Sequence, residues 1–249
     1  MFRNITPVTK NLIIINIVLF VATFLLQRMN INLDLILAGF FPLSPNFHLW
    51  QIVTHMFMHG SIMHIAFNML TLVSFGPVLE QVFGQKKYLT LYFAAGFGGF
   101  LFYNIWNFYE VSQLTNFLND HGYNLHEVYK YADFSYVGER PINTDNVEVK
   151  DAVQSLFNML TTPMVGASGA IFGVIAAFSV LFPNAEMMFM FIPFPIKAKF
   201  LTPIIIIVSI FLGIKQLDGD NVAHFAHIGG AIIGFLFALS WKKQFSKFQ

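Results

Sequence analysis

The sequence contains no cysteine and little charge, and both shortages narrow the possible functions. Without cysteine, the protein can form no disulfide, hold no metal through thiolates and use no thiol nucleophile. Charged residues make up 11% of its 249 residues, whereas an average soluble domain carries about 25%. Basic and acidic residues nearly cancel, and the net charge of +1 argues against a nucleic-acid partner.

Apolar residues dominate the composition of the sequence. They account for 56% of the sequence, and phenylalanine alone for 31 residues. A bilayer span needs roughly 20 mostly apolar residues, and six runs meet or approach that length: 11–27, 64–82, 88–107, 168–183, 200–215 and 223–241. The sequence therefore predicts an all-α, polytopic membrane protein with a bundle of six transmembrane helices. The shorter runs predict local thinning of the bilayer or helices packed inside the bundle.

The basic residues between the runs indicate an orientation. Nine of the fourteen fall on one side of the predicted membrane: Arg3, Lys10, Lys86, Lys87, Lys197, Lys199, Lys242, Lys243 and Lys247. The positive-inside rule makes this side cytoplasmic, so we expect both termini in the cytoplasm. The expected location is the bacterial inner membrane. The first run resembles a signal peptide, but no small-residue cleavage pattern follows it. An uncleaved first span is therefore predicted.

Residues 108–160 interrupt the pattern between the third and fourth runs. They contain eight of the thirteen acidic residues, and no run among them is apolar enough to span. The orientation predicts an extracytoplasmic insertion within a single membrane domain of residues 1–249. Near its end, Val153, Leu156, Phe157 and Leu160 are spaced i, i+3, i+4 and i+7. That spacing predicts an amphipathic helix, for which the membrane surface is one possible site.

Ser168 begins the fourth apolar run, between Gly166 and Gly169. One interpretation is a packing serine that bonds to its own helix in a seam of small residues. The other is a nucleophile, which requires a base within reach. The residues around Ser168 do not decide between the two.

A candidate base lies in the sixth run. Positions +3, +4 and +7 from His227 are Gly230, Ala231 and Gly234, so the smallest face of this helix bears the histidine. Small residues let two helices pack with their backbones close together. Close packing of the fourth and sixth runs would bring the imidazole to the hydroxyl of Ser168, although a structural histidine remains the alternative.

Three histidines and an asparagine crowd the start of the second run. His64 and Asn68 are four residues apart and share a helix face. His55 and His59 have the spacing of the H-E-x-x-H metalloprotease motif, but its glutamate is absent from this sequence. A histidine-ligated metalloenzyme is therefore the weaker alternative, and we expect neither a metal nor another cofactor.

Together the three stretches resemble the rhomboid intramembrane serine proteases. They are Gly166-x-Ser168-Gly169, the run from His55 to Asn68, and Ala226-His227-x-x-Gly230-x-x-x-Gly234. The resemblance covers roughly residues 11–107 and 164–241. It implies a serine endopeptidase that cleaves transmembrane segments of other membrane proteins near their outer ends, with those proteins and the lipid bilayer as partners.

The resemblance also implies roles for individual residues. Ser168 is the implied nucleophile and His227 its general base, in a dyad without a carboxylate. The backbone N–H of Ser168 and the side chains of His64 and Asn68 are the implied oxyanion hole. The supporting residues are Gly166, Gly169, Phe172, Gly230 and Gly234. The segment of residues 28–60, between the first and second runs, is the implied outer loop. His55 and His59 match positions that brace this loop in the family.

The sequence departs from the family pattern at several positions. Gln51 stands where the outer loop usually has a bracing arginine, Phe172 stands where many relatives have tyrosine, and His224 is an additional histidine that we expect at the interface. The remaining alternative is a non-catalytic rhomboid-like protein that binds membrane helices. Such relatives lack the serine or the histidine, and this sequence has both. The oligomeric state stays open.

Overall fold

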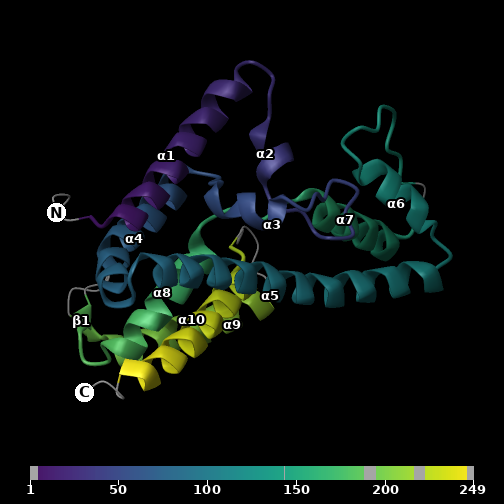
Figure 1. The fold of residues 1–249 in the computed structure, drawn as a ribbon. Helices are drawn as coiled ribbons and strands as arrows, with labels where there is room; N and C mark the ends of the chain where they lie inside the picture. The colour runs from purple at the N-terminus through teal and green to yellow at the C-terminus, as the bar shows by residue number, and fades with distance from the viewer. Residues whose placement is uncertain (1–4, 143, 188–194, 216–221, 246–249) are drawn as a thin grey trace.

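The computed structural model describes residues 5–142, 144–187, 195–215 and 222–245, which are mostly helical (Figure 1). Five helices within these ranges are long and apolar enough to span a membrane. They are α1 (Pro7–Gln27), α4 (Ile62–Phe83), α5 (Gln85–Asp120), α9 (Ala198–Lys215) and α10 (His224–Phe245). A sixth apolar helix, α8 (Ser168–Leu181), has 14 residues. The predicted all-α membrane bundle is confirmed.

Shorter elements connect these helices. They are α2 (Leu33–Leu37), α3 (Gln51–Thr54), the 3₁₀ helix η2 (His55–Phe57), α6 (Leu125–Ala132), α7 (Val147–Thr161) and the strands β1 (Glu186–Met187) and β2 (Ile196–Lys197). The two strands pair antiparallel, with Glu186 opposite Lys197. A single antiparallel bridge between Gly39 and Met164 joins the segment after α2 to the segment that leads into α8.

Helix α8 lies at the centre of the bundle. It packs against α4, α5, α9 and α10, and nine of its 14 residues are buried. Fourteen helical residues extend only about 21 Å, less than the roughly 30 Å of a bilayer's hydrocarbon core. Its short length is tolerated because neighbouring helices, and not lipid, surround it. The position agrees with the expectation that short runs pack inside the bundle.

Glycines let α10 lie directly on α8. A Cβ atom added to Gly230 would overlap the carbonyl oxygen of Gly169, and one added to Gly234 would overlap the carbonyl oxygen of Gly173. The two backbones are therefore in van der Waals contact over two helical turns. This contact brings the first turns of α8 and α10 side by side.

The insertion differs from the sequence expectation in two ways. The third span was predicted to end near residue 107, but α5 continues without a break to Asp120 and extends beyond the bundle toward α6 and α7 (Figure 1). Its 36 residues correspond to about 54 Å, far more than a bilayer core requires. The first part of the stretch 108–160 is therefore a continuation of the spanning helix.

The second correction concerns α7. The sequence analysis named the membrane surface as one possible location for its apolar face, but Val153, Leu156 and Leu160 are buried against protein. The extension of α5 carries Val111 and Leu118 on one stripe, which offers a partner for that face. The buried residues of this separate small core are Phe41, Val111, Leu118, Val128, Ala132, Val149, Ala152, Val153, Leu156 and Leu160.

Helix α1 is fixed to α4 through Glu80. The buried carboxylate of Glu80 accepts hydrogen bonds from the backbone N–H groups of Val8 (2.9 Å) and Thr9 (2.8 Å) and from the hydroxyl groups of Thr6 and Thr9. Unpaired N–H groups at a helix N-terminus favour an acceptor with negative charge. Glu80 thus caps α1 from the neighbouring helix.

Candidate active site

Ser168 and His227 lie within hydrogen-bonding distance. Ser168 is the first residue of α8, His227 stands in the first turn of α10, and the Nε2 atom of His227 lies 3.0 Å from the Oγ atom of Ser168. When the hydroxyl donates this bond, Nε2 is the acceptor and the ring is neutral. A serine with a neutral imidazole at this distance has the arrangement that activates a nucleophile.

Phe172 fixes the plane of the histidine ring. It stands four residues after Ser168 on the same face of α8, and its ring stacks on the imidazole of His227 with centroids 4.0 Å apart and planes 6° apart. The stack restricts the rotation of the imidazole through van der Waals contact.

Gly166 brings the segment before α8 against His64. Its φ is +125°, a conformation that residues with a side chain rarely adopt. A Cβ atom at Gly166 would lie 2.7 Å from Nε2 of His64 and 3.5 Å from Oγ of Ser168. The imidazole of His64 and the hydroxyl of Ser168 thus flank the same glycine. The N–H group of Gly166 donates a 3.0 Å hydrogen bond to the carbonyl oxygen of His55, which fixes this segment.

His59 orients the carboxamide of Asn68, a contact that the sequence did not reveal. The Nδ2 atom of Asn68 lies 2.9 Å from Nε2 of His59, and because an amide nitrogen only donates, His59 accepts. That role requires a neutral ring. Burial and, to a smaller extent, the nearby His64, 5.0 Å away between ring centroids, lower the pKa of His59 to about 4. The second N–H of the Asn68 amide is left for another acceptor.

His55 is a buried histidine with a structural contact. Its Nδ1 atom lies 2.7 Å from the carbonyl oxygen of Gln51, and burial lowers its pKa to about 4, so the ring is neutral at physiological pH. One ring nitrogen of each histidine, Nδ1 of His55 and Nε2 of His59, is thus engaged with a protein group. These contacts favour the loop-bracing interpretation of both histidines.

Gln51, which stands where the family usually has a bracing arginine, makes several hydrogen bonds to the backbone of the loop. It is fully buried, and its Oε1 atom accepts hydrogen bonds from the backbone N–H groups of His48 (3.1 Å) and Phe40 (3.4 Å). Its Nε2 atom donates to the carbonyl oxygen of Asn46 (3.2 Å). The neutral amide of Gln51 therefore connects the backbone at residues 40, 46 and 48.

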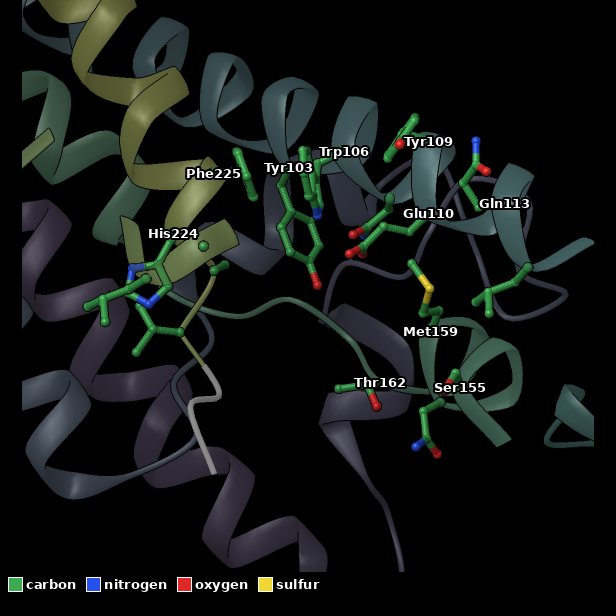
Figure 2. A pocket seen from close by; sticks show the side chains of 17 residues that line it. Tyr103, Trp106, Tyr109, Glu110, Gln113, Ser155, Met159, Thr162, His224 and Phe225 are labelled. Carbon is green, nitrogen blue, oxygen red and sulfur yellow. The ribbon is translucent and has the colours of Figure 1, made fainter. Parts of the chain in front are cut away.

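His224 lies beside the pair. Its ring meets the ring of His227 edge to face, with centroids 6.1 Å apart and planes at 83°. It also lines a cavity of about 680 Å³ on the side of α10 that faces α7 (Figure 2). Ser168, His64, Asn68 and His227 do not line this cavity, so it is separate from the candidate active site.

The arrangement can stabilise a negative charge next to the hydroxyl of Ser168. The backbone N–H of Ser168 belongs to the first turn of α8, where N–H groups lack helical partners and the helix dipole favours an anion. The imidazole of His64, on α4, flanks Gly166 together with the hydroxyl of Ser168, and Asn68 lies one turn further along α4. Donors that converge on one point stabilise the oxyanion of a tetrahedral intermediate.

Comparisons with known proteins identify the family to which the chain is similar. A sequence model of the Rhomboid domain matches residues 46–113 and 148–243, which include all four residues of the candidate site. The chain is 29% identical to rhomboid protease AarA of Providencia stuartii over 84% of this chain and 62% of that protein. It is 26% identical to an uncharacterized mitochondrial rhomboid protein of Schizosaccharomyces pombe, over 78% of this chain and 52% of that protein.

A further similarity is to rhomboid protease GluP of Bacillus subtilis, 26% identical over 76% of this chain and 25% of that protein. The chain thus spans between a quarter and about three fifths of the length of these relatives. Residues 114–147, which hold the end of α5 and all of α6, fall outside the domain match.

Proposed function

The chain belongs to the rhomboid family of integral membrane proteins, and from this premise we propose that it is an intramembrane serine endopeptidase. The single observation that carries the proposal is the 3.0 Å contact between Nε2 of His227 and Oγ of Ser168. A serine without a base is a weak nucleophile, whereas a base at this distance can take its proton during attack.

The proposed reaction begins with attack of the Ser168 hydroxyl on a substrate carbonyl carbon. His227 accepts the hydroxyl proton as the new C–O bond forms and later gives it to the leaving amine. The oxyanion of the intermediate accepts hydrogen bonds from the backbone N–H of Ser168 and from the side chains of His64 and Asn68. Removing one such donor costs about 100- to 1000-fold in rate in a comparable site. Water then hydrolyses the acyl-enzyme, with His227 as base.

The proposed substrates are transmembrane segments of other membrane proteins, cleaved near their outer ends. Helical backbone within a bilayer is internally hydrogen-bonded, so its carbonyl groups are hard to reach. Segments with small or helix-breaking residues near the end of the span can unwind into the site. With both termini cytoplasmic, the starts of α8 and α10 face the opposite side, in a bacterial inner membrane.

The proposed role of residues 108–160 is to border the substrate entrance. Their acidic composition and the position of α7, which leads directly into the segment before Gly166, motivate this role. Replacing residues 112–150 with a short linker should change the rate or choice of substrate, measured on several transmembrane substrates. Unaltered kinetics on all of them would reject the role.

The protease activity is tested by cleavage of a transmembrane substrate in proteoliposomes. The wild-type protein should release a fragment, whereas Ser168→Ala and His227→Ala should each lose activity and keep the thermal unfolding midpoint. A fully active Ser168→Ala protein would reject the proposal. The main competing function, non-catalytic binding of membrane helices, predicts that substrate capture without cleavage is the same in wild type and variants.

A further inference from the structure

The cavity of about 680 Å³ has no role in the chemistry above. It lies between α5, α7, the end of α9 and the start of α10, and residues from all four contribute to its wall (Figure 2). Binding sites for small ligands or side chains occupy about 300–1,000 Å³. The space is therefore large enough to hold part of a peptide.

The wall of the cavity combines aromatic rings with one carboxylate. Tyr103, Trp106 and Glu110 extend from α5 toward the space in front of α7, and Phe225 of α10 stacks on Trp106 with ring centroids 4.3 Å apart (Figure 2). Among the lining residues that the structure describes, Glu110 is the only acid. Aromatic faces next to a carboxylate suit a lysine or arginine side chain, through an ion pair and cation–π contact.

A buried donor in the same wall suits a peptide. The indole N–H of Trp106 is buried and has no hydrogen-bond partner within the described part of the chain. Buried donors normally find an acceptor, and a backbone carbonyl is the acceptor that every peptide offers. The cavity thus provides groups for a cationic side chain and for the chain that carries it.

The cavity is adjacent to the candidate active site. Ala223 lines both this cavity and the small space of about 10 Å³ around Ser168. His224, in the cavity wall, contacts His227 edge to face. A substrate segment that occupies the cavity is therefore separated from the reacting serine by the width of one residue of the chain.

The charge of the surrounding insertion points to the same kind of ligand. Residues 108–160 contain eight acidic and three basic residues, a formal charge of 3 − 8 = −5. Such a surface attracts basic segments over about one Debye length, roughly 8 Å at physiological ionic strength, and favours encounter with them.

We propose that this cavity is a specificity site for a basic residue of the substrate. It binds a lysine or arginine in the extracytoplasmic segment next to the cleaved span. Glu110 pairs with the cation, and the rings of Tyr103 and Trp106 contact its aliphatic stem. The assignment rests on the proposed protease function and adds a preference that the dyad itself does not have.

The first test compares matched substrates. Two synthetic single-span peptides, identical except for lysine or glutamine at one extracytoplasmic position near the span, are incubated with the full-length protein in liposomes, and the position is scanned along the segment. At one position, the kcat/KM of the wild type should be about tenfold higher for the lysine peptide than for the glutamine peptide. Glu110→Gln should lose this preference, and Glu110→Lys should prefer a glutamate peptide.

The matched control is Asp151→Asn, which removes the same charge from an exposed position of α7 outside the cavity. This variant should keep the wild-type preference. Equal preferences in wild type and Glu110→Gln, or equal losses in Glu110→Gln and Asp151→Asn, would overturn the assignment. A preference that appears only in liposomes without phosphatidylethanolamine would instead assign the cavity to a lipid headgroup.

The second test separates the cavity from the chemistry. Binding of the fluorescent lysine and glutamine peptides is measured on Ser168→Ala protein, with and without Glu110→Gln. The lysine peptide should bind about tenfold more tightly only when Glu110 is present. If the wild type cleaves neither peptide but this difference holds, the protease proposal fails and the binding site stands. If both peptides bind equally, the binding site fails whatever the activity.

Discussion

The imidazole of His227 lies parallel to the ring of Phe172, with 4.0 Å between centroids and 6° between planes. This stack is one contact that holds the plane of the imidazole while Nε2 lies 3.0 Å from Oγ of Ser168. The ring of Phe172 therefore acts through the position of the base, without touching the reacting atoms.

Removing the ring of Phe172 should impair catalysis more than binding. Because general-base catalysis contributes about 10²- to 10⁴-fold, Phe172→Ala should lower kcat by at least about tenfold and change KM little. Phe172→Tyr keeps the stack and should restore most of the activity. Steady-state kinetics on one transmembrane substrate measures both values. Equal loss in the alanine and tyrosine variants would show that the stack does not position the base.

Gly166→Ala should disrupt the oxyanion hole. The added Cβ would lie 2.7 Å from Nε2 of His64, and the φ of +125° is strained for alanine. We expect about a 100-fold loss of kcat. Gly122→Ala is the control, because Gly122 also has a positive φ, of 69°, but a Cβ there meets no atom within 4 Å. A similar loss of activity in both variants would point to general destabilisation.

The glycines of the two packed helices should not be equivalent. A Cβ on Gly230 would overlap the carbonyl oxygen of Gly169, whereas a Cβ on Gly169 would lie 3.5 Å from the carbonyl oxygen of Ala226, an ordinary contact. Gly230→Ala should therefore cost about 1–3 kcal/mol of stability by overpacking and lower activity with it. Gly169→Ala should be tolerated. Thermal unfolding and cleavage assays of Gly230→Ala and Gly169→Ala test this difference. Equal effects of the two substitutions would contradict the described packing of α10 on α8.

Acid should destabilise the fold through His59. Its folded pKa of about 4 lies below the ordinary 6.5, so the neutral ring stabilises the folded state above pH 6.5. That stability is lost as pH falls from 6.5 toward 4. His59→Gln cannot titrate, and its unfolding midpoint should fall less steeply over this range than that of the wild type. His55, with a similar pKa, titrates in both proteins. Parallel curves would show that His59 does not contribute.

The sequence predicted the features that depend on local spacing. The small face that bears His227 follows from the positions of Gly230 and Gly234, and the place of Ser168 at a helix start follows from the change from polar to apolar residues. Periodicity and composition determine which residues share a face, so Ser168 and His227 could be predicted as a candidate pair from the sequence.

Features that depend on tertiary contacts were not accessible in this way. Polar residues such as Glu110 ended the apolar run of α5, although the helix itself continues to Asp120. The apolar face of α7 packs on a stripe of that extension. Because the sequence did not predict the extension, it could not show whether this face packs on protein or lies on the membrane surface. The bracing role of Gln51 depends on backbone groups that only the folded loop brings to it.

The most direct test of the dyad is labelling with a fluorophosphonate, which reacts with an activated serine hydroxyl and not with an ordinary one. The purified protein in detergent or liposomes is treated with the reagent, and the modified residue is identified by mass spectrometry. The wild type should be labelled at Ser168, with labelling abolished in Ser168→Ala and strongly reduced in His227→Ala. Labelling of a folded wild-type protein at another residue, or equal labelling of wild type and His227→Ala, would contradict the assignment of Ser168 and His227 as nucleophile and base.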